Sequence, residues 1–198
     1  MEIMLEQLRD VGIEQVNITL HHKSEIVTEY FGDGRNFGVD INYVTEERPL
    51  GTAGALGLMD PPNDTILVIN GDVLTNLDFH AMLAYHREHG AELTMAVQQY
   101  NLELPYGVIE CEGALVKSLT EKPTRNILVN AGIYLLEPEV YKFIPNGETY
   151  DMTDLIQRLI QEALPVAAFP LREYWVDIGA FSDYEKAQRD IETVKGRP

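Results

Sequence analysis

Two apolar segments of this chain lead into an aspartate where a strand is expected to stop. Val68-Ile69 runs through Asn70-Gly71 to Asp72, and Tyr174-Trp175-Val176 runs to Asp177. In open α/β sheets, ligands bind beyond the carboxyl ends of the strands. Two carboxylates that meet there can hold a divalent cation, which in turn binds phosphate groups. The pair therefore indicates phosphate chemistry, whereas Asn-Gly-Asp alone is also typical of a plain turn.

A second candidate for chemistry is the segment Glu46-Glu47-Arg48-Pro49-Leu50-Gly51-Thr52-Ala53-Gly54. Its small residues let a flat ring or a phosphate approach backbone N–H groups closely. A tight turn is the alternative interpretation. The segment is not a P-loop, because the Gly-Lys-Ser/Thr ending is absent.

The elements that position these residues alternate between helix and strand. Apolar spacing and turn residues predict helices at residues 1–11, 23–31, 51–59, 78–89, 139–143, 153–162 and 181–194, with Asp78 as a cap. Strands are expected at residues 15–20, 39–44, 65–70, 93–99, 107–111, 115–119, 129–136 and 166–169. Such alternation favours a mainly parallel sheet, which the hairpin around residues 112–113 makes mixed. The consecutive apolar residues 66–69 predict a strand that is buried on both faces.

Composition narrows the class of protein. The formal net charge of −17 argues against wrapping a nucleic acid, since that requires clustered Lys and Arg. No apolar run approaches the roughly 18 residues of a membrane span, and no secretory signal opens the chain. We therefore expect a cytoplasmic protein of one domain, with no membrane and no nucleic-acid partner.

Six motifs in order resemble those of the sugar-1-phosphate nucleotidylyltransferases. They are LGTAGAL, NGDV, YGVIE, EKP, NAGIYLLEP and WVDIG, and the mannose- and heptose-1-phosphate guanylyltransferases are the most similar members. The resemblance implies a Rossmann-like α/β/α three-layer sandwich with a mixed, mainly parallel sheet. It also implies Mg²⁺ and transfer of a nucleotidyl group from a nucleoside triphosphate to a sugar 1-phosphate, with release of pyrophosphate.

The same resemblance assigns roles to residues. Asp72 and Asp177 match the catalytic pair that holds Mg²⁺, and Lys122 matches a lysine that contacts the sugar phosphate, although a solvated surface lysine is its alternative. The remaining matched positions bind substrate: Gly51 and Thr52 in the nucleotide loop, Gly107 against the sugar, and Glu121 and Asn130 at sugar hydroxyls.

Glu46 matches the family position that faces the edge of the base. A carboxylate can only accept hydrogen bonds, so it suits the N–H donors of guanine and opposes the carbonyls of uracil or thymine. This residue predicts GTP as the nucleotide. The alternative is a glutamate that faces solvent in an acidic loop.

The family's opening strand and its Gly-x-Gly-Thr/Ser-Arg-Leu-x-Pro loop have no match in this sequence. The resemblance therefore implies one domain over residues 1–198 that is truncated at its N-terminus, a sheet whose first strand is missing, and little or no turnover. A homodimer could cover the resulting sheet edge. A non-catalytic sugar-phosphate or nucleotide-sugar binding or regulatory module is the alternative function. A GT-A glycosyltransferase is a distant third, because no Asp-x-Asp motif is present.

Other residues are expected to have structural roles only. The histidines at positions 80, 86 and 89 are placed on the solvent face of a helix. Trp175 is assigned to packing in preference to a wall of the sugar pocket.

Overall fold

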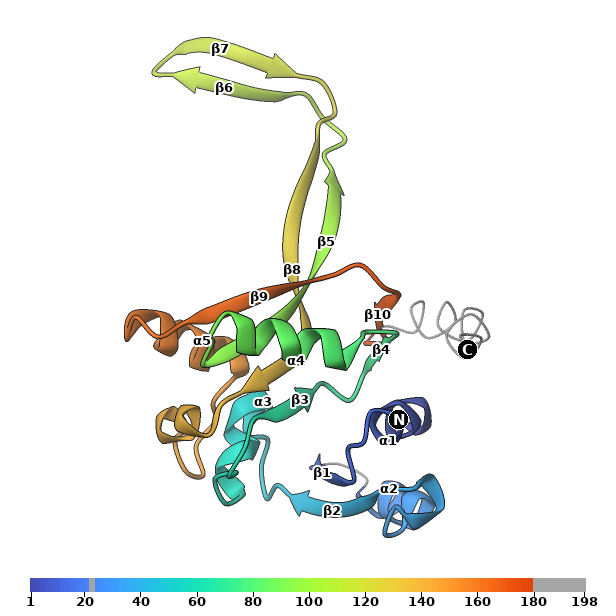
Figure 1. The fold of residues 1–198 in the computed structure, drawn as a ribbon. Helices are drawn as coiled ribbons and strands as arrows, with labels where there is room; N and C mark the ends of the chain where they lie inside the picture. Colours follow the sequence, from blue (N-terminus) through green and yellow to red (C-terminus); the bar gives the residue numbers. More distant parts are fainter. Residues whose placement is uncertain (22–23, 180–198) are drawn as a thin grey trace.

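The computed structural model describes residues 1–21 and 24–179 and shows a mixed α/β fold (Figure 1). The α-helices are α1 (Glu2–Asp10), α2 (Ser24–Phe31), α3 (Gly51–Gly54), α4 (Phe79–Glu88) and α5 (Met152–Gln161). Short 3₁₀ helices are η1 (Arg35–Phe37), η2 (Ala55–Leu58) and η3 (Pro138–Phe143). The strands are β1 (Gln15–Leu20), β2 (Asp40–Thr45), β3 (Ile66–Ile69), β4 (Val73–Thr75), β5 (Leu93–Glu103), β6 (Val108–Glu112), β7 (Leu115–Thr120), β8 (Thr124–Leu136), β9 (Val166–Leu171) and β10 (Trp175–Asp177).

Strand β8 shows how the core divides into two halves. Ile133 and Leu135 belong to one buried apolar cluster, and Tyr134 and Leu136 belong to another. Because successive strand side chains point to opposite faces, the two clusters lie on opposite faces of the sheet. Helices α1 and α4 contribute to the first cluster, and α3 and α5 contribute to the second. The predicted three-layer arrangement is confirmed.

Local sequence explains the two longest helices. The carboxylate of Asp78 accepts a hydrogen bond from the Ala81 N–H at 2.9 Å, so it caps α4 as predicted. Helix α5 begins with a reciprocal capping box between Asp151 and Asp154. Its buried residues recur at helical spacing, which gives one apolar face: Met152, Leu155, Ile156 and Leu159.

The central sheet has four strands in the order β3-β8-β5-β9. β9 pairs in parallel with β5, whereas β8 pairs antiparallel with both β3 and β5. Three of the four strands therefore run in one direction, and β8 runs in the opposite direction between two of them. The sheet is mixed, as predicted. β1 and β2 form a separate parallel pair.

Most predicted elements are confirmed within a few residues, and the strand at 15–20 is confirmed at both ends. The segment 139–143 forms a 3₁₀ helix where an α-helix was expected. Strand β4 escaped prediction because it has only three residues, whereas β10 agrees with the strand expected to stop at Asp177. The helix expected at 181–194 lies outside the described residues. Among the helices of the described ranges, none has both the length and the apolar character of a membrane span.

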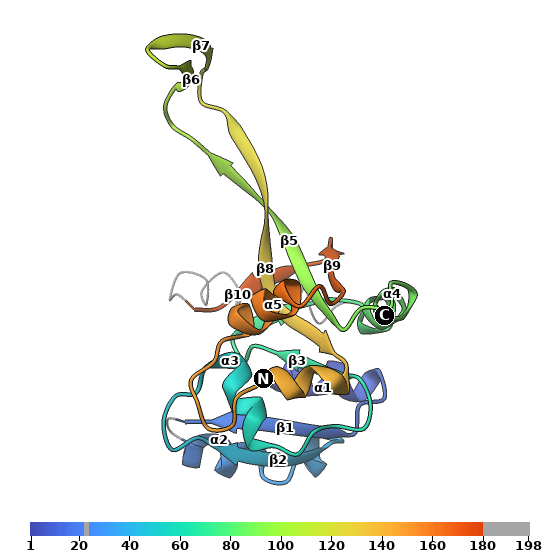
Figure 2. The same cartoon turned by 90° about the vertical axis from the view of Figure 1, so that its left-hand side faces the viewer.

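β5 and β8 continue beyond the body of the protein as a long two-stranded arm (Figures 1 and 2). The arm comprises residues 98–129 and carries the hairpin β6–β7 at its end. Large apolar side chains on it are exposed, and Tyr106 and Leu115 are each 77% exposed. A two-stranded ribbon buries little apolar surface by itself, so it gains little stability from hydrophobic burial. The arm therefore presents apolar surface away from the core.

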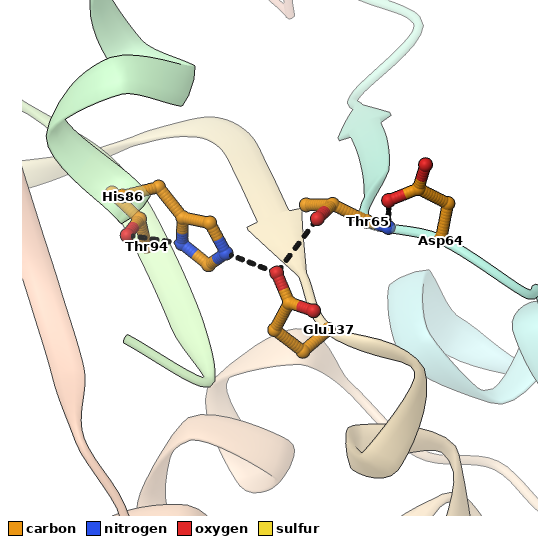
Figure 3. Close-up of polar contacts among 5 residues, drawn as sticks. All are labelled: Asp64, Thr65, His86, Thr94 and Glu137. Atoms are coloured by element: carbon orange, nitrogen blue, oxygen red, sulfur yellow. Dashed lines mark hydrogen bonds and ion pairs between the residues drawn. The ribbon is translucent and has the colours of Figure 1, made fainter. Parts of the chain in front are cut away.

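A buried polar network joins the far end of β8 to helix α4 and to the segment before β3 (Figure 3). His86 is 1% exposed, which corrects its predicted place on the solvent face. Its Nε2 lies 2.8 Å from the Glu137 carboxylate, and its Nδ1 lies 2.7 Å from the Thr94 hydroxyl. The Thr65 hydroxyl donates to the same Glu137 oxygen at 2.7 Å. Polar partners thus make burial of the imidazole tolerable.

Candidate functional site

The structure brings Asp72 and Asp177 to one place. β10 pairs antiparallel with β4, and in this register Asp177 lies opposite Val73. The Ile178 N–H donates to the Asp72 carbonyl at 2.8 Å, which extends the pairing by one step. Both aspartates are exposed. Two aspartates from distant parts of the chain therefore lie at the same end of the β4–β10 ladder.

The turn that carries Asp72 is fixed against β8. The Val73 N–H donates to the Asn70 carbonyl at 3.2 Å, and the Asn70 N–H donates to the Gly132 carbonyl at 2.9 Å. Gly132 has φ +72°, and a Cβ there would lie 2.8 Å from Asn70 Nδ2. Only glycine fits that close approach without strain. Gly132 is thus a structural determinant of the Asp72 turn, and the sequence signal for it was its place in the NAGIY motif.

Asn130 lies on β8, two residues before Gly132, so it adjoins the same turn. Its Oδ1 accepts the Gly132 N–H at 3.0 Å, and its Nδ2 donates to the Tyr134 hydroxyl at 2.7 Å. Burial raises the pKa of Tyr134 above its ordinary value, against the opposing effect of this hydrogen bond. The Tyr134 phenol therefore stays neutral, and the Asn130 amide is held in a fixed orientation on the strand that supports the Asp72 turn.

Trp175 connects β10 to the same part of β8. Its Nε1–H donates to the Ala131 carbonyl at 2.8 Å, and its half-buried ring packs against the α1/α4 side of the core. The predicted packing role is consistent with this placement. Through Trp175, the strand that ends at Asp177 is tied to the strand that carries Asn130.

We expect Trp175→Phe to lower the free energy of unfolding by about 1 kcal/mol, because it removes one hydrogen bond and leaves the carbonyl of the buried Ala131 without this partner. Urea unfolding followed by circular dichroism measures this. Tyr106→Phe, an exposed aromatic change on the arm, is the control and is expected to change stability by less than about 0.5 kcal/mol. Equal stability of the two variants would contradict the role of the Trp175 bond.

Glu46 follows β2 and stabilises the loop that it opens. Its Oε2 accepts the Leu50 N–H at 2.8 Å, and its own N–H donates to the Leu20 carbonyl at 2.8 Å. The side chain is half-buried, so a glutamate that simply faces solvent does not describe it. One carboxylate oxygen thus has a structural partner in the loop.

Gly51 and Thr52 are held by the segment before α5. Gly51 has φ +77°, and a Cβ there would collide with Asp151 and with the Tyr150 carbonyl. The Thr52 hydroxyl accepts the Met152 N–H at 2.9 Å. Two further backbone N–H groups of α3 already have partners within the protein, because Ala53 and Gly54 both donate to the Tyr150 carbonyl. The packing supports the tight-turn interpretation of this loop more than an open phosphate cradle.

The remaining predicted residues form a separate group on the arm, where the β5–β8 ladder ends and the hairpin β6–β7 begins. A Cβ at Gly107 would lie 3.0 Å from Glu121 Oε2, so these two residues are neighbours. Lys122 follows Glu121, is exposed, and has φ +44°. Gly107, Glu121 and Lys122, which the resemblance assigned to the sugar 1-phosphate, thus lie near one another.

The structure does not bring this arm group to the two aspartates. β5 and β8 stay paired from Val97–Asn130 out to Glu103–Thr124. Asn130 and Thr124 are six residue steps apart along β8, which corresponds to about 20 Å. Both views show the end of the arm far from β10, and Figure 1 shows that it is also far from β4 (Figures 1 and 2). Continuous pairing holds the arm straight, so Lys122 lies well away from Asp72.

The carboxylate pair can act as a partial site for a hard cation. Across residues 1–21 and 24–179, no group of three or more His, Cys, Asp or Glu side chains is arranged to hold a metal ion. Mg²⁺ commonly takes only one or two protein carboxylates and completes its shell with water and substrate phosphates. Two exposed aspartates at strand ends fit that kind of binding.

Comparison with known proteins gives a consistent result. The nucleotidyl transferase family model matches residues 1–194. A UTP–glucose-1-phosphate uridylyltransferase from Synechocystis is 36% identical over 212 residues, covering 96% of this chain and 55% of the relative. A mannose-1-phosphate guanylyltransferase from Mycobacterium tuberculosis is 29% identical over 197 residues, covering 95% and 54%. The chain therefore spans about half the length of these relatives.

Solved structures share the fold. HddC from Yersinia pseudotuberculosis aligns with a TM-score of 0.72 at 22% identity, covering 96% of this chain and 84% of that chain. HddC complexed with GMP-PN gives a TM-score of 0.71 at 21% identity, with the same coverage. At this level of identity the likeness concerns the fold alone.

Proposed function

We propose a reaction for this chain, which belongs to the nucleotidyl transferase family. In the proposed reaction, a phosphate oxygen of a sugar 1-phosphate attacks the α-phosphorus of a nucleoside triphosphate. The bond from that phosphorus to the β-phosphate oxygen breaks, and pyrophosphate leaves. The observation that supports this proposal most directly is that Asp72 and Asp177 lie at the same end of the β4–β10 ladder.

Asp72 and Asp177 would hold Mg²⁺ in this reaction. The ion would supply charge neutralisation for the triphosphate, whose negative charge a site with two carboxylates would otherwise repel. The donor set fits, because both groups are oxygen ligands, both are exposed, and the triphosphate itself can complete the coordination. The residues position charge and substrate, since this chemistry needs no protein nucleophile.

Asn130 and Glu46 would orient the two substrates. Asn130 adjoins Gly132, which supports the Asp72 turn, and this supports its assignment to the sugar of the attacking phosphate. Glu46 lies at the end of β2, and its second carboxylate oxygen would accept from guanine. The named relatives include a uridylyl- and a guanylyltransferase, so the proposal of GTP rests on Glu46 alone.

We expect Glu46→Gln to weaken GTP binding about tenfold relative to UTP, because it replaces a charged acceptor of guanine N–H groups. Glutamine retains an oxygen that can accept the Leu50 N–H, so the loop is preserved. Fluorescence titrations with both nucleotides in Mg²⁺ measure the ratio, and Glu47→Gln is the matched control. Tighter binding of UTP than GTP to the unmodified chain would refute the choice of guanine.

A second candidate function is binding of a sugar phosphate or nucleotide-sugar without turnover. One observation favours it: the arm holds Lys122 well away from the carboxylates, so in this conformation no cation from the arm faces the site. Such a module would keep Mg²⁺-dependent binding and lack chemistry. The two candidates therefore differ in product formation and agree in ligand binding.

The deciding experiment combines a binding and a turnover measurement on the same protein. The chain is incubated with GTP, mannose 1-phosphate and Mg²⁺, and ³¹P NMR follows nucleotide-sugar and pyrophosphate. Product that is absent with Asp177→Asn supports the transferase. Saturable binding of GDP-mannose without product supports the second candidate. Neither product nor Mg²⁺-dependent binding of any of these ligands would refute both.

A further inference from the structure

The arm of residues 98–129 has one apolar face and one polar face. β5 and β8 pair residue by residue along it, with Tyr100 opposite Ile127. Directly opposed residues share a face, and successive residues alternate between faces. One face therefore carries four apolar residues and a single charge: Tyr100, Leu102, Ile127, Val129 and Arg125. The other face is mainly polar, with Gln99, Asn101, Glu103, Thr124, Asn126 and Leu128.

The apolar face of the arm lies open to solvent. Tyr100 is 54% exposed, and Ile127 is 43% exposed. A two-stranded ribbon needs further strands or a packed layer on its hydrophobic face to be stable by itself. The same face of β5 continues into the core at Ala96, which belongs to the cluster against which Trp175 packs. A partner that covers the arm would therefore lie on the side of the sheet where Trp175 leads to Asp177.

The distribution of charge favours a second copy as this partner. Residues 98–129 contain four Glu against three Lys and Arg, so the arm carries only −1 of the formal net charge of −17. Two copies therefore repel through their bodies and hardly through their arms. Both views show the arm projecting clear of the body (Figures 1 and 2). Antiparallel arms would let the two apolar faces meet with the acidic bodies at opposite ends.

Two cations near the end of the ladder have no acidic partner. None of the ion pairs found within residues 1–21 and 24–179 involves Lys122 or Arg125. The exposed carboxylates Asp72 and Asp177 belong to the other end of the arm, since Trp175 is bonded to Ala131 at its base. In an antiparallel pair, the end of each arm reaches the base of the other. The charges that one chain keeps apart would then be brought together between two chains.

We propose that the arms of two copies pack face to face and antiparallel about a two-fold axis, and that Lys122 of the partner subunit completes the site of Asp72 and Asp177. The proposal rests on the proposed function, in which this site binds a sugar 1-phosphate. The Lys122 ammonium would neutralise that phosphate. One chain alone would hold the carboxylates without this cation.

The register of the ladder determines which residues meet. With the axis at the Asn101–Asn126 pair, the middle of the ladder, Tyr100 lies over Leu102 of the partner subunit. Residues of β8 that are equally far from Asn126 also lie over one another. Lys122 of the partner subunit then comes over Asn130. Packed sheets lie about 10 Å apart, so a lysine of one layer and a phosphate bound on the other can fill the space between them.

Sedimentation velocity tests the interface itself. We expect the unmodified chain to form a dimer, and Tyr100→Asp to raise its dissociation constant at least tenfold, because a charge enters the apolar face. Asn101→Asp places the same charge on the polar face of the same strand, so it is the matched control and is expected to keep the dimer. An unmodified chain that stays monomeric would overturn the proposal, as would equal effects of the two variants.

The placement of Lys122 is tested without turnover. A nitroxide is attached to Lys122→Cys in a Cys111→Ser background, which lacks the only native cysteine. This protein is mixed with unmodified chain that alone carries ¹⁵N, so every broadened signal comes from the other copy. We expect the strongest broadening at Asn130 and Trp175. Broadening centred on the β6–β7 hairpin would show parallel arms and overturn the proposal.

Mixing two defective variants tests whether the site is completed between chains. Asp177→Asn and Lys122→Ala are each expected to form little product. Their one-to-one mixture is expected to recover about a quarter of the unmodified activity, because half of the dimers are mixed and each of these has one site with both residues. Adding Tyr100→Asp to both variants is expected to abolish the recovery. No recovery, although the unmodified chain turns over, would overturn the proposal.

Failure of the proposed function gives a different result from failure of this inference. If the unmodified chain forms no product, the transferase reaction is refuted. The same mixture is then assayed for Mg²⁺-dependent binding of GDP-mannose, and the number of binding sites is expected to recover to the same quarter. A dimer in which neither product nor binding recovers would refute a role of Lys122 in the site of the partner subunit.

Discussion

Asp72→Asn and Asp177→Asn are each expected to weaken Mn²⁺ binding in the presence of GTP at least tenfold, and the double variant about a hundredfold. Each change removes one of the two carboxylates that the structure brings to the strand ends. A neutral amide is a poorer ligand for a hard cation, and each tenfold loss corresponds to about 1.4 kcal/mol. Trp175, the only tryptophan of the chain, lies two residues before Asp177 and reports binding by Mn²⁺ quenching of its fluorescence.

Asp40→Asn provides the matched control for this prediction. Asp40 is exposed and begins β2, at the opposite end of that strand from Glu46. It changes the net charge by the same amount, so it separates local coordination from general electrostatic attraction. Equal weakening by all three single variants would mean that the two strand-end aspartates have no special role.

His86→Leu is expected to lower the free energy of unfolding by about 2 to 4 kcal/mol, the largest effect on stability that we predict. The change removes partners from Thr94 and Glu137 at a position that is 1% exposed. Urea unfolding at pH 7 measures it. His80→Leu, an exposed change on the same helix, is expected to stay within about 0.5 kcal/mol. A loss for His86→Leu no larger than that of the control would show that the network does not stabilise the fold.

The same network predicts a dependence of stability on pH. Burial by itself would raise the pKa of Glu137, but hydrogen bonds from Thr65 and His86 and the charge of His86 outweigh it and lower the pKa below 4.5. The stabilisation is therefore present above the unfolded pKa and is lost as the pH falls through the folded value. Between about pH 5 and pH 3, we expect stability to fall less steeply in His86→Leu than in the unmodified chain. Parallel curves for the two proteins would contradict this linkage.

Sequence reasoning predicted the elements whose pattern is local and long. β1 was predicted with its exact bounds by alternation, and α4 was predicted with its Asp78 cap. The place of Asp72 followed from a buried apolar run that ends at a small residue. The β4–β10 ladder was not predicted, because strands of three residues leave too little pattern to distinguish them from turns.

Long-range features explain the other differences. The burial of His86 was missed because its polar partners, Thr94 of β5 and Glu137 just after β8, are distant from it in sequence or supplied by another element. The arm is another case, since its straightness depends on pairing between residues distant in sequence. Motif order alone therefore grouped Lys122 with Asp72, whereas the structure separates them.

Paramagnetic NMR would locate the bound cation directly. Mn²⁺ is added in substoichiometric amounts to ¹⁵N-labelled chain with saturating GTP, and line broadening is mapped along the backbone. We expect the strongest broadening at Asp72, Val73, Asp177 and Ile178, with weaker effects at Asn130. Broadening centred on any other part of the chain, with Asp72 and Asp177 unaffected, would contradict a cation site at these strand ends and the proposed reaction with it.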